Sequence, residues 1–388
     1  MPLRYPTETD LPFVSRLLEG ETTYRSSRVD NESFILIYCN QENVPVGVVF
    51  LAELDAFRKN AALILRIDPG SELSARIRMA LEAMEVVFGK LCLHKVSCEI
   101  TVDDKWSAYL YKKIGFVEEG RLREHQFDGS RYVDVLRLGL FATEWYGVER
   151  QLKDYIFGLE VLAEQKDQKK SYSIVVLSDS SSWINFDIQD LCLEWTALGH
   201  QVHWAHKTEN IPSADFCFCL SFGRIVSSAV RSKFRHTLVV HESELPRGKG
   251  WSPLTWQIIE GVNRIPVTLL EAVDQVDSGT VYAQCWIEFQ GDELVDDLRK
   301  AQAKTTHTLC RWFVDEYPNS AMQGREQRGE ESFYPRRRAA DSELDPNKTI
   351  SEQFNLLRVV DNLNYPAFFR HSGGCYRISI EHMESDCK

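Results

Sequence analysis

The sequence lacks the patterns that mark metal-binding, secreted and membrane-spanning proteins. Its ten cysteines include no Cys-x-x-Cys pair, and no histidine cluster has the spacing of a zinc site. The start has no long apolar core and no run of about eighteen apolar residues occurs, so we expect neither a signal peptide nor a membrane span. These absences predict a cytoplasmic protein with reduced, mostly buried thiols and no bound metal.

An excess of basic residues is also missing, because the formal net charge at pH 7 is −12. Nucleic-acid backbones are bound by basic faces, so nucleic acid is not an expected partner. A local basic pocket for one pyrophosphate is still compatible with this charge. The length of 388 residues and the hydrophobic fraction of 44% are sufficient for two or three globular domains.

The first half of the chain mixes strands and helices. Helical spacing of apolar residues marks two segments, and Gly115 is placed to end the second of them. A charged helical connector follows over 146–170, and its polar end is typical of a linker or a solvated helix end. Strands are expected at 33–39, 46–54, 94–102 and 132–140, and helices at 74–91 and 105–114.

A different pattern begins at Ser171, where short apolar strands alternate with helices. This alternation predicts a parallel, doubly wound sheet, which binds ligands at the carboxyl ends of its strands. Beyond about residue 311 the chain becomes polar, and a helix over 350–360 and a closing hairpin over 368–380 are expected. The strands of the sheet are expected at 171–178, 201–206, 214–223 and 236–243, with a helix at 184–200.

The segment 236–261 indicates a strand, an irregular loop and a helix. His241 lies at the exit of the strand, where such sheets place catalytic side chains. The loop 246–251 contains two glycines and a proline, which suit a backbone that passes close to a ligand. About 35 residues further on, Asp274 and Asp277 lie between two expected strands.

These features together resemble the formyltransferases that act on methionyl-tRNA and on sugar nucleotides with 10-formyltetrahydrofolate. The resemblance extends from Ser171 to about Ile380. One departure is that the family asparagine two residues before the histidine, which helps to hold the formyl oxygen, is Val239 here. Another side chain substitutes for it, the backbone and histidine suffice, or the site is inactive. The family pattern, Asn-x-His, Leu-Pro-x-x-x-Gly and Asp-x-Gly, is matched by His241, Leu245, Pro246, Gly250, Asp277 and Gly279.

Formyl transfer requires attack by a neutral amine, stabilisation of an oxyanion and movement of a proton. Histidine suits the last two tasks because its pKa lies near working pH. We therefore assign His241 to the oxyanion or to a proton shuttle, and Asp277 to orienting the imidazole and acting as a base toward the amine. Each residue also has an ordinary structural interpretation, as a strand-end histidine and as the cap of a turn.

The resemblance further implies sites for the folate and the acceptor. The three consecutive arginines at 336–338 could clamp phosphates, although a solvated charge run is equally consistent. Two aromatic residues near the end could stack on a base or sugar, or pack in a core. Folate contacts are implied for Phe222, Gly223, Ile225, Pro246, Gly250 and Asp274. Acceptor contacts are implied for Arg247, Trp251, Arg336, Tyr365 and Phe368.

The segment 103–145 closely resembles the GCN5-related N-acetyltransferases, and in particular branches that act on small amines, ribosomal-protein termini and the amino sugar of pseudaminic acid synthesis. The resemblance implies that Tyr111 is the general acid for the departing thiolate. The residues in family register are Tyr111, Gly115, Phe116, Glu119, Gly120, Arg123, Asp128, Gly129, Tyr132 and Asp134.

The loop that binds coenzyme A in that family departs from its pattern here. Its glycines let backbone N–H groups hold the pyrophosphate, but the corresponding residues are Glu72, Ser74 and Arg76. The asparagine common before the tyrosine helix is Asp104. We therefore expect acetyl-CoA binding to be weak or lost, which would leave a scaffold, a dimerisation unit or a sugar-binding relic.

The predicted architecture is α/β. An N-terminal GCN5-related N-acetyltransferase-like α+β domain over 1–147 precedes a helical linker over 148–170. A doubly wound Rossmann-like formyltransferase domain over 171–312 and a small C-terminal subdomain over 313–388 follow. The predicted function is formylation of the amine of a nucleotide-linked amino-deoxy sugar, such as a 4-amino-4,6-dideoxy sugar of pseudaminic acid or related surface-glycan synthesis. The alternatives are an enzyme that also N-acetylates and a non-catalytic binding protein, and a homodimer remains open.

Overall fold

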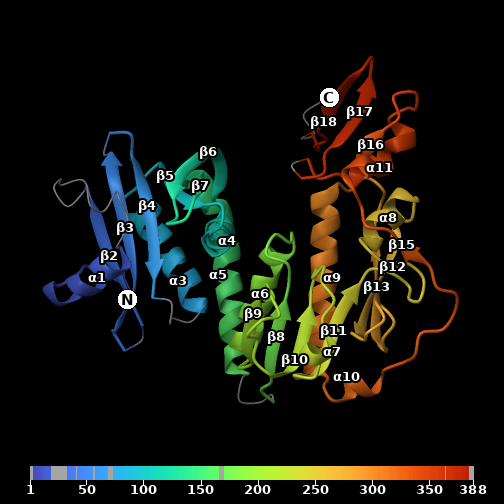
Figure 1. Ribbon diagram of the computed structural model, residues 1–388. Helices are drawn as coiled ribbons and strands as arrows, with labels where there is room; N and C mark the ends of the chain where they lie inside the picture. Colours follow the sequence, from blue (N-terminus) through green and yellow to red (C-terminus); the bar gives the residue numbers. More distant parts are fainter. Residues whose placement is uncertain are drawn as a thin grey trace. The chain divides into compact units, whose positions relative to one another are not determined.

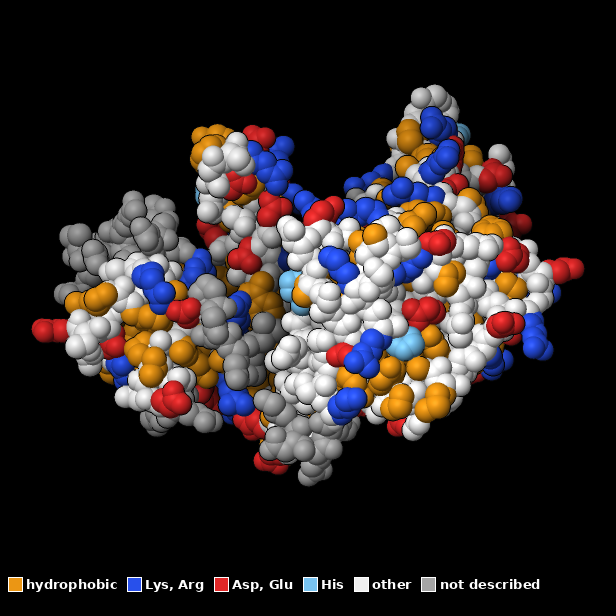
Figure 2. All heavy atoms as spheres, turned by 60° about the horizontal axis from the view of Figure 1, so that its bottom comes forward, with side chains coloured by type: hydrophobic (Ala, Val, Ile, Leu, Met, Phe, Trp, Pro, Cys, Tyr) orange, Lys and Arg blue, Asp and Glu red, His pale blue; other side chains and the backbone are white. Residues whose placement is uncertain are grey.

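The structure is a computed structural model of the chain, and contacts divide it into two compact units, Met1–Lys166 and Asp167–Lys388 (Figure 1). On the face in Figure 2, acidic and basic side chains are interspersed and apolar side chains form small patches between them. No helix in the described part of the chain is both long and apolar enough to cross a bilayer. The structure describes residues 3–18, 33–40, 42–55, 57–68, 73–165, 170–362 and 364–383.

The first unit is built on a mixed sheet with the order β1-β2-β3-β4-β5-β7-β6. Its neighbours are antiparallel except for the parallel pair of β4 and β5. The strands are β1 (Leu3–Arg4), β2 (Phe34–Cys39), β3 (Pro45–Asp55), β4 (Asn60–Ile67), β5 (Lys95–Thr101), β6 (Val117–Phe127) and β7 (Tyr132–Phe141). The helices are α1 (Leu11–Leu17), α3 (Leu73–Met84), α4 (Lys105–Lys113) and α5 (Ala142–Glu164), and a π-helix spans Glu85–Lys90.

The predicted connector is a helix that belongs to the first unit. α5 buries Trp145, Leu152, Ile156 and Leu159, and the Trp145 ring stacks on Phe88 with centroids 6.4 Å apart. This apolar stripe explains why the segment packs as a helix of the unit instead of forming a free linker. The polar stretch at 166–169 lies outside the described residues.

The second unit is built on a sheet with the order β14-β13-β11-β10-β8-β9. The strands β9, β8, β10 and β11 are parallel, as predicted. At the other edge β13 is antiparallel to both β11 and β14, so the sheet is not wholly parallel. The connection between β13 and β14 is short, as is possible only between antiparallel neighbours. The strands are β8 (Ser173–Leu177), β9 (Gln201–Ala205), β10 (Ala214–Cys219), β11 (Phe234–His241), β13 (Arg264–Glu271) and β14 (Val281–Glu288).

The two faces of this sheet bury different residues, because successive strand residues point to opposite sides. Leu238 of β11 packs in the large core that contains Leu309 and Phe313 of a long helix, α9 (Val295–Asp315). Val239 packs on the opposite face with Cys217 and Cys219 of β10. The remaining helices of the sheet layer are α6 (Asn185–Ala197), α7 (Ser228–Arg231), α8 (Pro253–Ile259) and α10 (Asn319–Met322).

The end of the chain forms small elements beside this sheet. β12 (Lys249–Gly250) pairs with β15 (Phe333–Tyr334), and β16 (Glu343–Leu344), β17 (Ala367–His371) and β18 (Gly374–Ile378) form a separate small sheet. The predicted closing hairpin is therefore confirmed as β17 and β18. The helix expected over 350–360 is shorter, with a 3₁₀ turn at Ser351–Gln353 and α11 at Phe354–Arg358.

Candidate active site

A cavity of about 540 Å³ lies at the carboxyl ends of β10 and β11 in the second unit. Five segments line it, namely the loop 179–184, the turn 219–226, the end of β11 at 239–242, the loop 250–255 and residues 270–273 with 276–277. Gln302 and Thr306 of α9 complete the lining. The cavity therefore forms where a sheet of this type places its ligand sites.

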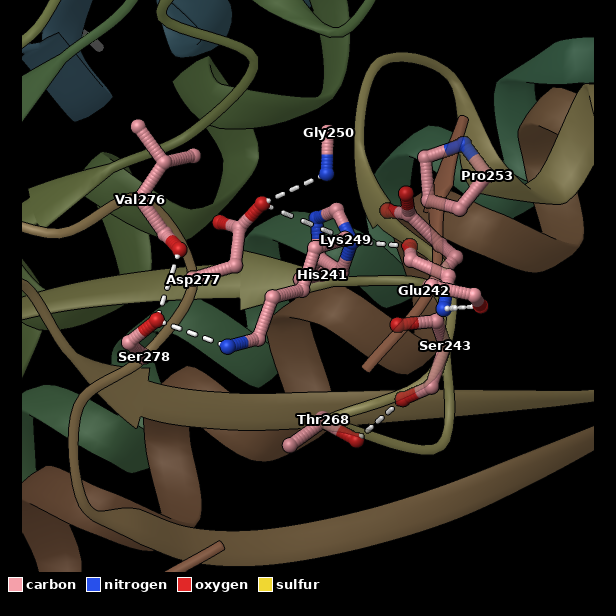
Figure 3. A network of polar contacts seen from close by, with 12 residues as sticks. His241, Glu242, Ser243, Lys249, Gly250, Pro253, Thr268, Val276, Asp277 and Ser278 are labelled. Carbon is pink, nitrogen blue, oxygen red and sulfur yellow. Dashed lines mark hydrogen bonds and ion pairs between the residues drawn. The ribbon is translucent and has the colours of Figure 1, made fainter. Parts of the chain in front are cut away.

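His241 is buried at the end of β11 and lines this cavity. Its Nε2 lies 2.8 Å from the Gly248 carbonyl oxygen and 3.8 Å from Asp277 Oδ2 (Figure 3). A carbonyl can only accept, so Nε2 carries the hydrogen and donates it to Gly248. The Gly248 carbonyl therefore fixes the ring, and this corrects the prediction that Asp277 orients it, since 3.8 Å is too long for a hydrogen bond.

Asp277 lies in the loop between β13 and β14, as predicted, and adopts a left-handed φ of +51°. Its Oδ2 accepts a hydrogen bond of 2.9 Å from the Gly250 amide, so the carboxylate is fixed to the loop that carries Gly248. Two residues later the loop requires glycine, because a Cβ on Gly279 would lie 1.8 Å from the Glu271 carbonyl oxygen. The Asp-x-Gly pattern thus has a steric basis here.

Lys249 and Gln327 bind this loop through hydrogen bonds, and neither was predicted as a site residue. Lys249 is 1% exposed, and its Nζ donates to Ser278 Oγ at 2.7 Å and contacts Glu331 Oε1 at 2.5 Å. Gln327 Nε2 donates to the carbonyls of Asp277 (2.8 Å) and Gly279 (2.9 Å). Lys249 lies between the two glycines of the 246–251 loop, whereas nothing in the polar stretch around Gln327 marks it.

The predicted folate contacts are brought together only in part. Phe222, Gly223, Ile225 and Gly250 line the cavity. Asp274 does not, since its side chain is 85% exposed and pairs with Arg231. Pro246 is buried but is likewise not among the lining residues.

The turn at Gly223 has a defined partner. Its amide donates to Asp179 Oδ2 at 2.9 Å, and a Cβ at this position would lie 3.3 Å from the ring of Trp251. The glycine therefore lets an indole ring lie against the turn, where it forms one wall of the cavity.

Only some of the predicted acceptor contacts lie at the cavity. Trp251 lines the cavity, and the Arg336 guanidinium lies 4.7 Å from the centroid of its ring. Arg247 is exposed and does not line the cavity, and neither do Tyr365 and Phe368, which belong to the region of the small sheet at the end of the chain.

The neighbouring arginines of the 336–338 run have different surroundings. Arg337 is half-buried, and its guanidinium donates to the Ser342 hydroxyl at 3.0 Å and to the Val359 carbonyl at 3.4 Å. Its contacts fasten the chain end, so within the predicted phosphate clamp Arg337 is already engaged, whereas Arg336 and Arg338 are exposed.

Glu242 is a further cavity residue that the sequence analysis did not single out. Gln302 Nε2 donates to its Oε1 at 2.7 Å, and Gln257 Nε2 donates to its backbone carbonyl at 2.6 Å. Burial raises the pKa of this carboxyl, while the charge of His241 acts in the opposite direction. Its place directly after the histidine was the signal available in the sequence.

In the first unit, the predicted general acid Tyr111 lies on α4 and is 2% exposed. Its Oη accepts from the Leu65 amide at 3.3 Å. The helix begins with Asp104, which accepts from the Ser107 amide at 2.9 Å, and Gly115 follows its end with φ +98°, as predicted.

The predicted coenzyme A loop lies partly outside the described residues, since the placement of Glu72 and the side chain of Ser74 are not described. The Arg76 guanidinium lies 5.0 Å from the centroid of the Trp106 ring, and burial lowers its pKa. A bulky cationic residue therefore occupies a position where the family pattern has glycine.

Comparison with known proteins separates the two units. A family model described as formyl transferase matches residues 196–313, a range that contains His241 and Asp277. Methionyl-tRNA formyltransferases of Streptococcus gordonii and Sorangium cellulosum are 26% and 32% identical over 146 and 107 residues, which are 37% and 26% of this chain. The chain covers 47% and 34% of these two proteins, so it spans half of their length or less.

The first unit is similar to a different group of enzymes. A spermidine N(1)-acetyltransferase of Vibrio cholerae is 30% identical over 129 residues, which is 33% of this chain and 74% of that protein. A solved structure of a variant of the Vibrio cholerae spermidine N-acetyltransferase is 24% identical, covers 37% of this chain and 97% of that chain, and superposes with a TM-score of 0.34.

Proposed function

We propose a formyl transfer for this chain, which belongs to the GCN5-related N-acetyltransferases in its first unit and carries a formyltransferase domain with a Rossmann-like sheet in its second. The donor in this proposal is 10-formyltetrahydrofolate. The acceptor is the amino group of a nucleotide-linked amino-deoxy sugar, for which a 4-amino-4,6-dideoxy sugar of surface-glycan synthesis is our candidate.

One observation supports this proposal above all others. His241 and Asp277 lie 3.8 Å apart, nearly buried, at the end of a cavity of about 540 Å³. An imidazole can take up and return a proton near neutral pH, and a carboxylate at this distance stabilises the imidazolium that results. Because Gly248 fixes the Nε2 hydrogen, the other ring nitrogen is the one that takes up a proton.

The cavity suits a flat donor. Trp251 and the Gly223 turn form one wall, and Val273 and Val276 contribute apolar surface from the loop that leads to Asp277. The bound folate would supply the formyl carbon. The residues of this chain would hold its ring system through the turn 219–226, exclude water and position the acceptor amine beside His241.

Trp251 and Arg336 support a nucleotide-linked acceptor. An aromatic ring with a guanidinium stacked 4.7 Å above it, at the edge of the cavity, presents a surface for a base and a charge for a phosphate. Methionyl-tRNA, the substrate in the names of the relatives, is disfavoured by the net charge of −12.

The proposal is tested with 10-formyltetrahydrofolate and a panel of nucleoside-diphosphate amino sugars, with mass spectrometry to detect the gain of one formyl group. We expect one or more panel members to gain it, and His241→Asn or Asp277→Asn to abolish the gain. A wild-type protein that formylates no panel member would contradict the proposal and favour a binding or assembly role.

N-acetylation by the first unit is the second candidate, because the relative that matches this unit is an acetyltransferase. Arg76 beside Trp106 argues against close approach of a pyrophosphate to this loop. Calorimetry with acetyl-CoA separates the candidates, since heat of binding would indicate a bifunctional enzyme. A cytoplasmic setting and a homodimer remain expectations from the sequence.

A further inference from the structure

The cavity contains a third ionisable group beside His241 and Asp277. The family asparagine is replaced by Val239, whose side chain lies in an apolar cluster with Cys217 and Cys219. Glu242 lies on the opposite side of the strand end, toward Gln302 of α9. One side of the end of β11 thus carries valine where the family has asparagine, and the other side carries the carboxylate of Glu242.

Glu242 is held in place from three directions. Gln302 donates to its carboxylate at 2.7 Å, Gln257 of α8 donates to its carbonyl at 2.6 Å, and its backbone continues directly from His241. Within the described residues, Gln302 is the one side chain that donates to this carboxylate. In Figure 3, Asp277 and Glu242 lie on opposite sides of the His241 ring.

The charges around Glu242 suit a group that exchanges protons. His241 on the same strand end favours its ionised form, and Asp277 on the loop between β13 and β14 disfavours it. Gln302 of α9 and Gln257 of α8, which face it from the packed helices, carry no charge. A half-buried carboxylate that makes no salt bridge within the described residues binds an incoming ammonium group well, because the ammonium supplies a counter-charge.

We propose that Glu242 is a catalytic residue that binds the protonated amine of the acceptor and removes its first proton. This inference rests on the proposed formyl transfer and assigns a base for which the family pattern has no counterpart. Gln302 positions Glu242 by holding Oε1, which leaves the acceptor to approach the carboxylate from the cavity.

The step balances in protons and bonds. The acceptor ammonium gives one proton to Glu242 and becomes a neutral amine. Its nitrogen forms a bond to the formyl carbon while the bond from that carbon to the folate nitrogen breaks. The second proton of the amine passes to the free ring nitrogen of His241, whose imidazolium Asp277 stabilises, and from there to the folate nitrogen, and Glu242 releases its proton to solvent.

The test is Glu242→Gln, which keeps the size of the side chain and its contact with Gln302 but cannot take up a proton. With the nucleotide amino sugar that the wild type formylates best, we expect kcat/KM at pH 7 to fall about 10²-fold. The loss should shrink about tenfold per pH unit toward the pKa of the acceptor amine, because the free amine then enters without help. The wild-type profile should be flatter over the same range.

Two further variants separate a base from a structural role. Glu242→Asp keeps a carboxylate but alters the packing. If Glu242 is a base, Glu242→Asp should be more active than Glu242→Gln. If its role is structural, the order should be reversed. Glu244→Gln is the matched control, since Glu244 is exposed two residues further on, and it should match the wild type. Tetrahydrofolate binding and the melting temperature should be unchanged in all three variants.

The outcomes also distinguish the two proposals. Formylation by the wild type together with a Glu242→Gln variant within twofold of it at every pH would overturn the role of Glu242 alone. Loss of folate binding or of the fold in Glu242→Gln, with Glu242→Asp no more active, would also overturn it. A wild type that formylates no acceptor would overturn both proposals.

Discussion

Lys249 and Glu331 form an ion pair in which only the lysine is buried. We therefore expect substitution of the two partners to change stability and activity in opposite orders. Lys249 is 1% exposed, whereas the side chain of its partner Glu331 is 44% exposed. Lys249→Met removes the buried charge and leaves a carboxylate that water can solvate. Glu331→Gln leaves the buried ammonium beside two neutral groups, the Ser278 hydroxyl and the Phe333 ring.

The expected magnitudes follow from this asymmetry. Removing one partner of a buried pair costs about 3 kcal/mol when an uncompensated charge stays behind, and exposure of Glu331 reduces this to about 2 kcal/mol. Replacing the buried charge by an apolar side chain of similar volume should change stability by less than about 1 kcal/mol. For a unit of this size, about 2 kcal/mol corresponds to a melting temperature lower by roughly 4–8 °C.

Activity should follow the opposite order. Lys249→Met removes the hydrogen bond to Ser278, so the loop that carries Asp277 loses one of its anchors, and we expect kcat to fall by roughly tenfold. Urea unfolding and steady-state formyl transfer measure the two effects on the same preparations. A Lys249→Met variant that is less stable than Glu331→Gln would refute the reasoning, because the buried charge would then be a net stabilising element.

Three other perturbations have defined outcomes. Gly279→Ala should abolish formyl transfer and lower the melting temperature, because its Cβ would lie 1.8 Å from the Glu271 carbonyl oxygen; an active variant would mean that the loop moves freely. Trp251→Ala should raise the KM of the nucleotide acceptor about fivefold through loss of stacking, and an unchanged KM would remove this ring from the acceptor site. Burial lowers the pKa of His307 to about 4, so the unfolded chain binds a proton between pH 6.5 and 4 that the folded chain does not, and stability should fall by about 3 kcal/mol as the pH falls through this window. His307→Gln should flatten this part of a urea-unfolding series against pH, and an unaltered slope would contradict the assignment.

Periodicity was sufficient to predict most local elements of the second unit. The central strands of the second unit, the helix α6 and the closing hairpin lie where alternation and apolar spacing predict them. The fold class is confirmed, with an N-acetyltransferase fold followed by a formyltransferase domain. His241 and Asp277 could be singled out because together they match the formyltransferase pattern, and the structure places them 3.8 Å apart; their catalytic roles stay predictions.

The supporting residues could not be predicted in the same way. Gln327 reaches Asp277 across 50 positions of sequence, and Gln302 reaches Glu242 across 60, so no local pattern links them. Tyr365 and Phe368 were assigned from resemblance, yet they lie with the small sheet at the chain end, outside the cavity lining. Such contacts depend on the tertiary path of the chain over the sheet. The alternation of apolar and polar residues within a strand carries no information about that path.

The pairing of β12 with β15 has a practical consequence for exchanging acceptor specificity between related enzymes. The Trp251 amide donates to the Tyr334 carbonyl at 3.2 Å, and the Lys249 amide donates to the Ser332 carbonyl at 2.9 Å. These bonds fix the register of the segment that carries Arg336 against the loop that carries Gly248. A chimaera joined after Tyr334 would keep this ladder and the cavity lining and would exchange Arg336 with the rest of the chain end, whereas a junction before Ser332 would require the donor sequence to rebuild the support of the imidazole as well.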